Sequence, residues 1–283
     1  MATTIGVLFD FDDTLAPDST TALLEKYDID PEAFWFKEFQ SHVREGYDPT
    51  VAYLTLLVQK IGEDQPLGLL TTEDLESFGQ ELNQTLYPGV RRLFDDVGEI
   101  VEQYDDVVVK FYIVSEGLEP IIQGTDISTR CEAVYASRLS ENSDGVIERI
   151  QRPISFTDKT RYIYEINKGI TPEASQKNPY EVNTQMDPED RQIPFENMIY
   201  IGDGITDIPC FSLVKDRGGR VFGVIDSDEG SAKQRAIRDI GSPRRAGNLN
   251  KPVYEERGRL GSLLRLTIEG ICTERTIDDL EAL

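Results

Sequence analysis

The stretch VLFDFDDTLAP, from Val7 to Pro17, places an apolar run directly before three acids. The continuous apolar residues from Ile5 to Phe9 are typical of a strand that is buried on both faces of a parallel sheet. Asp10, Asp12 and Asp13 follow where this strand is expected to end. Because open sheets of this kind bind ligands beyond the carboxyl ends of their strands, the acids predict a functional site there.

Three further apolar runs have strand character, and helical patterns lie between them. The runs cover Val107–Val114, Asn197–Gly202 and Arg220–Ile225. The segment ENSDG, Glu141–Gly145, predicts a hairpin turn. Strands that alternate with helices are typical of a parallel sheet. We therefore expect an α/β fold with a Rossmann-like parallel sheet and helices on both of its faces.

From residue 17 to residue 87 the pattern is helical. Val51–Ile61 carries an apolar helical stripe, and Pro31–Gly46 reads as an aromatic-rich helix that begins at its proline. Thr72 is the expected N-cap of a third helix. We therefore expect two units, a core made of residues 1–16 and 88–283 and an inserted helical cap domain made of residues 17–87.

The charge and the cysteines limit the classes of partner and compartment. The 283 residues carry a formal net charge of −23 and include three isolated cysteines. Nucleic acids and anionic membranes require basic patches, so neither is an expected partner. No apolar run approaches the ~20 residues of a membrane-spanning helix, and the N-terminus shows no export signal. Isolated cysteines suit a reducing compartment, so we expect a cytoplasmic protein whose oligomeric state the sequence leaves open.

Polar residues also follow the later strands of the predicted sheet. Ser115–Gly117 comes directly after the second strand, and GDGITD, Gly202–Asp207, comes after a later one. Between these two segments, Lys159 lies at the start of a predicted helix. Because the carboxyl ends of parallel strands meet at one edge, these groups are expected to converge with the first acids on one site.

The order of these motifs resembles a known family. An Asp-x-Asp-x-Thr match arises by chance in roughly one chain of this size in six, whereas a Gly-Asp-Gly-x-Thr-Asp match arises on the order of once in a thousand. The ordered set resembles the four motifs of the haloacid dehalogenase (HAD) superfamily. The helical insertion after the first motif resembles the C1-type cap of phosphoserine phosphatases. The residues that carry the resemblance are Asp10, Asp12, Thr14, Ser115, Lys159, Asp203 and Asp207.

The resemblance implies a role for each motif residue. It makes Asp10 the nucleophile and Asp12 the general acid and base, whose presence favours a phosphatase over a dehalogenase. Lys159 would offset negative charge, with Arg161 and Lys168 as nearby alternatives. The remaining assignments are phosphate contacts for Thr14, Ser115, Glu116 and Gly117, and metal contacts for Asp10, Asp12 (through its backbone carbonyl), Asp203 and Asp207. Ser115 is also suited to capping the next helix, Asp207 to starting one, and Thr14 to supporting the turn.

Electrostatics requires a metal ion at such a site. A phosphate that approaches these carboxylates meets a repulsion of ~4 kcal/mol for each pair of unit charges at 4 Å and an effective dielectric constant of 20. A hard divalent cation removes this repulsion, and ligation by carboxylate and phosphate oxygens is typical of Mg²⁺. The sequence therefore predicts Mg²⁺ as the cofactor.

The function expected from these motifs is that of a hydrolase acting on phosphoric monoesters through an aspartyl phosphate. The expected partner is a small phosphorylated metabolite. Two alternatives stay open, a phosphotransferase or phosphomutase that uses the same aspartyl phosphate, and a non-catalytic protein that binds a phosphate ligand on the same fold.

Two features bear on the substrate. Phosphoserine phosphatases carry a glutamate, in the segment after the first motif, that binds the substrate amino group, whereas this chain has Ser19 with Asp18 beside it. This difference puts phosphoserine in doubt. The polar loop Lys168–Pro194, with four prolines, is a candidate cover for the site.

Overall fold

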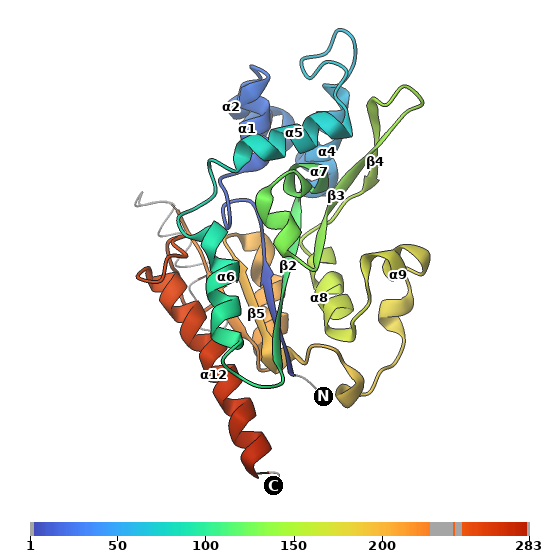
Figure 1. Cartoon of the computed structure of the whole chain (residues 1–283). Helices are drawn as coiled ribbons and strands as arrows, with labels where there is room; N and C mark the ends of the chain where they lie inside the picture. The colour runs from blue at the N-terminus through green and yellow to red at the C-terminus, as the bar shows by residue number, and fades with distance from the viewer. Residues whose placement is uncertain (1–2, 227–239, 241–244, 282–283) are drawn as a thin grey trace.

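A six-stranded, mostly parallel sheet forms the centre of the molecule (Figure 1). The computed structural model describes residues 3–226, 240 and 245–281. The strand order is β4-β3-β2-β1-β5-β6, and the only antiparallel pair among the described strands is the β3–β4 hairpin. The predicted α/β fold is confirmed. The strands are β1 (Thr3–Phe9), β2 (Val107–Leu118), β3 (Ala133–Glu141), β4 (Ile147–Arg152), β5 (Met198–Gly202) and β6 (Arg220–Gly223).

Strand β1 occupies the position at which the strand order reverses. It pairs in parallel with β2 on one side and with β5 on the other. The chain adds β2 and β3 on the first side and then returns to add β5 and β6 on the second. In open α/β sheets, the crevice at such a switch point is the place where ligands bind. The acids that follow β1 therefore lie at the position that the topology favours for a site.

Helices cover both faces of the sheet, and the alternation of side chains along β1 explains why. Val7 and Phe9 point into one apolar cluster, and Leu8 points into another. The first cluster is closed by α6 (Val90–Val101) and α12 (Arg259–Glu281), and the second by α8 (Asp158–Lys168) and α10 (Ile208–Asp216). In Figure 1, α6 and α12 lie on one side of the sheet and α8 on the other.

The helices between β1 and α6 form a separate apolar cluster above the sheet edge (Figure 1). Leu54, Leu57 and Phe78 of this cluster pack with Leu139 and Ile147 of the β3–β4 hairpin. The division into a core and a C1-type cap remains a prediction. The inserted helices are α1 (Ser19–Lys26), α2 (Pro31–Ala33), η1 (Phe34–Phe39), α3 (Gln40–Arg44), α4 (Pro49–Gln59) and α5 (Thr72–Leu82), and α7 (Glu119–Gln123) packs beside them.

Two details of this insertion differ from the expectation. The helix predicted over Pro31–Gly46 contains a six-residue π-helical segment, η1, at its centre. The N-cap of α5 is Thr71 and not Thr72, because the Thr71 hydroxyl accepts from the Asp74 backbone N–H while the Asp74 carboxylate accepts from the Thr71 N–H. This reciprocal capping box satisfies two backbone donors at once.

The segment Lys168–Pro194 does not cover the site. It contains a short helix, α9 (Pro172–Lys177), and two 3₁₀ turns, η3 (Glu181–Asn183) and η4 (Pro188–Asp190). Lys168 donates to the backbone carbonyls of Val182 and Thr184, which folds the segment back beside α8. The lysine thus satisfies carbonyls of its own loop, and the loop lies away from the edge that carries the acids.

Cys131, Cys210 and Cys272 are all free thiols. Across the described ranges, none of the helices combines the length and the apolarity that a membrane crossing demands.

Candidate active site

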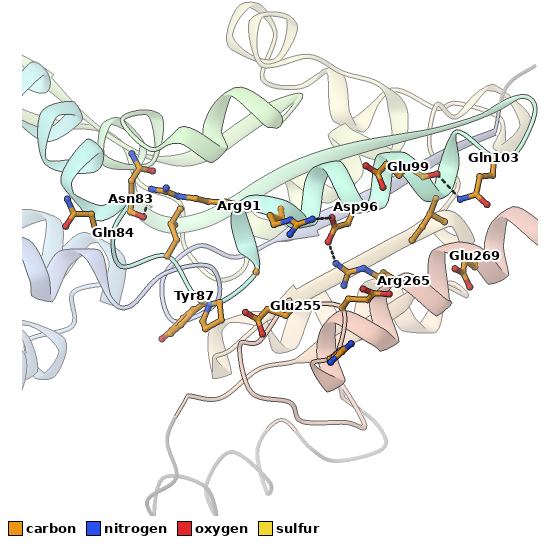
Figure 2. A pocket seen from close by; sticks show the side chains of 17 residues that line it. Asn83, Gln84, Tyr87, Arg91, Asp96, Glu99, Gln103, Glu255, Arg265 and Glu269 are labelled. Atoms are coloured by element: carbon orange, nitrogen blue, oxygen red, sulfur yellow. Dashed lines mark hydrogen bonds and ion pairs between the residues drawn. The ribbon is translucent and has the colours of Figure 1, made fainter.

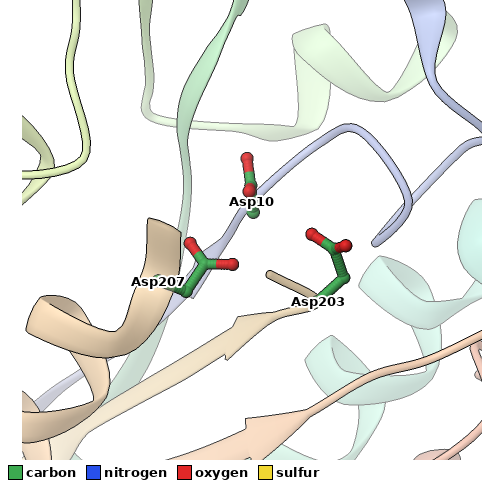
Figure 3. A group of neighbouring side chains, drawn as sticks. All are labelled: Asp10, Asp203 and Asp207. Atoms are coloured by element: carbon green, nitrogen blue, oxygen red, sulfur yellow. The ribbon is translucent and has the colours of Figure 1, made fainter. Parts of the chain in front are cut away.

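Three carboxylates meet at the carboxyl edge of the sheet (Figure 3). Asp10 follows β1, Asp203 follows β5, and Asp207 lies at the start of α10. Their nearest carboxylate oxygens all lie within 4.8 Å of one another. The parallel pairing of β1 with β5 produces this convergence, since Phe9 and Ile201 are register partners and each motif begins just beyond them.

Lys159 supplies the positive charge for this cluster. Its Nζ donates to Asp10 Oδ2 at 2.7 Å and to Asp207 Oδ1 at 2.9 Å, and its side chain is completely buried. Burial alone would lower the pKa of Lys159, but the two carboxylates outweigh it and hold that pKa well above its usual value. The alternatives are engaged elsewhere, because Arg161 pairs with Glu165 and Lys168 binds its own loop.

Asp207 is held in place by several donors. Besides Lys159, its carboxylate accepts from the Tyr200 hydroxyl at 2.7 Å and from the Gly204 backbone N–H at 3.1 Å. A carboxylate with this many donors is fixed in orientation. Tyr200 was not predicted as part of the site. The sequence feature that could have revealed it is a tyrosine inside the otherwise apolar run NMIYIG, because a buried tyrosine hydroxyl needs a polar partner.

Asp10 is oriented by its neighbours as well. Its Oδ1 accepts from the Phe11 backbone N–H at 2.7 Å, while its Oδ2 faces Lys159. Burial raises the pKa of Asp10 to about 6, and Lys159 limits that rise. Burial, together with the charges of Asp207 and Asp10, raises the pKa of Asp203 well above its usual value. Asp10 and Asp203 are thus both costly to ionise without a further cation.

Asp12 lies between the sheet edge and the helical insertion. Its Oδ1 accepts from the Ser19 backbone N–H at 2.7 Å, at the start of α1. Burial, with a contribution from the Asp18 charge, raises the pKa of Asp12 to about 8. Gly117 packs against it so closely that a Cβ there would lie 2.5 Å from Asp12 Oδ2. A glycine at this position therefore leaves room for the acid.

The predicted phosphate contacts are brought to the same place, with one exception. Ser115, Glu116 and Gly117 line the pocket that also contains Asp10 and Asp12. The Ser115 Oγ accepts from the Gly117 N–H at 3.0 Å, so Ser115 does not cap α7 and keeps its own proton for another acceptor.

Thr14 is the exception among the predicted contacts. It is fully buried and does not line the pocket. Its backbone N–H donates to the Phe11 carbonyl, and its own carbonyl accepts from the Tyr254 hydroxyl. Both contacts are made by backbone groups, and the Thr14 hydroxyl is buried without a hydrogen-bond partner among the described residues, so the role of this side chain stays a prediction.

The pocket itself is a cavity of about 620 Å³. Core acids form one side of it, and Trp35, Phe39 and Tyr53 of the helical insertion form the other. From the sequence, Trp35 and its phenylalanine neighbours are expected mainly to form the core of this insertion, with one aromatic residue as a candidate to face the substrate. A larger cleft of about 910 Å³ lies between α6 and α12 (Figure 2). It contains an ion pair between Arg265 and Asp96 and none of the predicted catalytic acids.

Comparisons with known proteins identify the fold. No protein-family model matches the sequence. An uncharacterised protein from Borreliella burgdorferi is 28% identical over 237 residues, which is 75% of this chain and 79% of that protein. A HAD-family hydrolase from Salmonella enterica serovar Typhi superposes with a TM-score of 0.54 and 15% identity, over 83% of this chain and 66% of its own length. The chain has the HAD hydrolase fold.

A phosphoserine phosphatase, solved as a phospho-aspartyl intermediate analogue, shares this HAD fold. Its TM-score is 0.52 and its identity 17%, and the match covers 93% of this chain and 99% of that one. The match thus spans most of both chains, and at this identity it shows the shared fold alone.

The three carboxylates suit a hard cation. All the ligand atoms they offer are oxygens, and Mg²⁺ is bound in proteins by carboxylates and water. Like charges held this close are also unfavourable without a cation between them. The donor set therefore fits Mg²⁺, with Asp10 and Asp203 as the carboxylates that line the open pocket.

We predict that Mg²⁺ stabilises the folded protein. At a concentration 100 times its dissociation constant, a ligand of the native state adds about 2.7 kcal/mol to the free energy of unfolding, which for a chain of this size is on the order of 5–10 °C in Tm. The Asp203→Asn variant should lose most of this shift, whereas an exposed Asp64→Asn variant should keep it. Thermal unfolding with MgCl₂ or with KCl of equal ionic strength measures the effect. Equal shifts in both variants would contradict the site.

Proposed function

We propose that this protein is a Mg²⁺-dependent phosphatase that hydrolyses a small organic phosphomonoester through an aspartyl phosphate on Asp10. The observation that carries the proposal is the buried Lys159, which bridges Asp207 and Asp10, and Asp10 lines the same pocket as Asp12 and Ser115. A fully buried lysine is costly unless it holds charged groups in place, so this arrangement indicates a site that handles negative charge. The HAD fold of the chain supports the same conclusion.

The first step forms a bond between Asp10 and phosphorus. An Asp10 oxygen attacks, and the bond between phosphorus and the alcohol oxygen breaks. Asp12, with its raised pKa, is largely protonated at neutral pH and donates its proton to the departing alcohol. Ser115 Oγ–H is free to donate to a phosphate oxygen, because the oxygen of that hydroxyl already accepts from Gly117.

The second step releases phosphate. Asp12, now a carboxylate, takes a proton from a water molecule, and that water attacks phosphorus while the bond to Asp10 breaks. Lys159 stays within hydrogen-bond distance of Asp10 and stabilises the carboxylate that returns. When bound, Mg²⁺ would supply the charge that lets a phosphate dianion approach the acids. Its contacts would be Asp10, Asp203 and the Asp12 carbonyl, with Asp207 orienting Lys159 beside them.

The test is release of inorganic phosphate from a panel of small phosphomonoesters, with Mg²⁺ and with a chelator. Turnover that requires Mg²⁺ supports the proposal. Consumption of the ester without inorganic phosphate, and with a phosphorylated acceptor alcohol as product, would identify a phosphotransferase instead. Binding without any bond cleavage would identify a phosphate-binding protein.

We predict that the pH dependence follows Asp12. The first step needs a protonated acid with a pKa of about 8, so kcat/KM for an alkyl phosphate should fall as pH rises through that value. p-Nitrophenyl phosphate has a leaving group that needs no proton, and its kcat/KM should stay nearly level there. The Asp12→Asn variant should lower kcat/KM for the alkyl ester by ~10²–10⁴ and for the nitrophenyl ester far less. Equal losses for both esters would contradict the role of Asp12.

A further inference from the structure

The half of the catalytic pocket that faces the helical insertion has an aromatic wall. Trp35, Phe39 and Tyr53 all line it. The Trp35 ring centroid lies 5.4 Å from that of Phe39 and 6.1 Å from that of Tyr53. The three rings therefore form one continuous surface beside the position that the alcohol part of a substrate would occupy.

Hydrogen bonds orient two of the three rings of this wall. Trp35 Nε1 donates to Thr21 Oγ1 at 2.9 Å, and the Tyr53 hydroxyl donates to the backbone carbonyl of Glu116. Trp35 and Phe39 both belong to the π-helical segment η1, and π-helical turns are frequently found at functional sites. Tyr53 thus ties the aromatic wall directly to the last residues of β2, which include Ser115.

Charge in the pocket has a single sign. Among the described residues that line it there is no lysine or arginine, and apart from the Tyr53 phenol its ionisable side chains are all carboxylates. Lys159 is completely buried, and its ammonium already bonds to two aspartates. An anionic group on the alcohol would therefore meet repulsion that nothing in the described lining relieves. The carboxylates are Asp10, Asp12, Asp13, Asp18, Glu116 and Asp203.

Glu116 is the carboxylate that the chemistry above does not use. Its Oε1 is buried and has no hydrogen-bond partner among the described residues, although Glu116 lines the cavity. Burial raises the pKa of Glu116 to about 7. A buried carboxylate oxygen without a partner is costly, and a cation in the pocket would remove that cost.

From this geometry we propose that the substrate is the phosphate monoester of a small amino alcohol, whose ammonium group lies against the rings of Trp35 and Phe39 with Glu116 as its counter-charge. Aromatic faces attract ammonium groups, and quaternary ammonium ligands are bound by such rings in other proteins. The proposal rests on the phosphatase function proposed above and names its substrate class. It also predicts discrimination against esters that carry a carboxylate.

Two matched pairs of substrates test it. Phosphocholine and 3,3-dimethylbutyl phosphate have the same shape and differ in the positive charge. O-phosphoethanolamine and O-phosphoserine differ in one carboxylate. In each pair we expect kcat/KM to favour the first ester by at least about tenfold. Equal kcat/KM values within both pairs would overturn the proposal.

Variants assign the discrimination to named residues. Trp35→Leu and Glu116→Gln should each lower the ratio of kcat/KM for phosphocholine to that for 3,3-dimethylbutyl phosphate toward one. Phe36→Leu is the matched control, because Phe36 lies in the same segment but is 72% exposed and does not line the pocket. The ratio compares two substrates on one variant, so a partly unfolded preparation does not change it. A ratio unchanged in both pocket variants would overturn the assignment.

A binding measurement separates this inference from the proposed hydrolysis. Calorimetry with the Asp10→Asn variant and Mg²⁺ compares the affinity of phosphocholine with that of 3,3-dimethylbutyl phosphate. Preferential binding of phosphocholine without turnover of any ester by the wild type would support the amino-alcohol site and reject the phosphatase. Equal turnover and equal affinity of the two esters would support the phosphatase and reject the amino-alcohol site.

Discussion

Replacing Asp10 by Asn should lower kcat by at least about 10⁴-fold, because the amide cannot form the acyl phosphate on which hydrolysis depends. Asn keeps the size of the side chain, and Lys159 keeps its contact with Asp207. The fold should therefore persist, which circular dichroism and the Tm can verify. The rate is measured as phosphate release from the best ester of the panel with saturating Mg²⁺.

Two further measurements make the Asp10 result specific. An acid quench of the wild type during turnover should trap a phosphorylated protein, and the same quench of Asp10→Asn should trap none. Asp64→Asn, the same change at an exposed position of the helical insertion, should keep the wild-type rate. A rate in Asp10→Asn above a tenth of the wild type would remove Asp10 as the nucleophile, whatever the metal dependence.

The largest effect on stability is expected for Lys159→Met. Removing one partner of a buried charge pair leaves the other uncompensated and costs about 3–5 kcal/mol. Here the loss leaves Asp10 and Asp207 facing each other without the ammonium that bridges them. Denaturant unfolding in the presence of a chelator measures the difference from the wild type. The surface pair between Lys26 and Glu81 is the matched control, and Lys26→Met should cost less than about 1 kcal/mol.

The destabilisation of Lys159→Met should grow with pH. The pKa of Lys159 is raised in the folded state, so its stabilising contribution is complete below the unfolded pKa of 10.5 and is lost only as pH rises through the higher folded value. The pKa of Asp10 is about 6 in the wild type, where the Lys159 ammonium limits its rise, and the variant removes that ammonium. That acid then ionises at higher pH and at greater cost, so the loss at pH 8 should exceed the loss at pH 5.5.

A double-mutant cycle tests the cause. Adding Asp207→Asn to Lys159→Met removes one of the uncompensated charges, and the double variant should recover part of the lost free energy. If the double variant loses the sum of the two single effects, the ammonium does not stabilise the protein through Asp207, and the electrostatic explanation is wrong.

Part of the site could be predicted from the sequence because the residues that indicate it are neighbours along the chain. Asp10 and Asp203 each follow a short apolar run within one or two residues, and the end of a buried strand in a parallel sheet determines where they lie. Ser115 was predicted from the same kind of apolar run, although β2 does not end before it and continues to Leu118. Strand identity, strand alternation with helices and the switch point at β1 follow from these runs and from the rules of parallel sheets.

Other features depend on contacts between distant residues. Lys159 meets Asp10 across 149 positions and Asp207 across 48. Local sequence did not exclude Arg161 or Lys168, which lie two and nine positions along the chain from Lys159. Only packing of α8 against the sheet selects one of the three cations. Thr14 illustrates the reverse case, in which a motif residue is buried in the turn and excluded from the pocket.

The sequence by itself determined the parallel sheet, the helical insertion and the acids at the strand ends, because each follows from a pattern of residues that are neighbours along the chain. Only the tertiary structure decided that Trp35, Phe39 and Glu116 share one cavity with those acids, and that no residue of Lys168–Pro194 lines it. The reason is physical, since burial, pairing and charge inside a cavity are set by segments that meet only after the chain has folded.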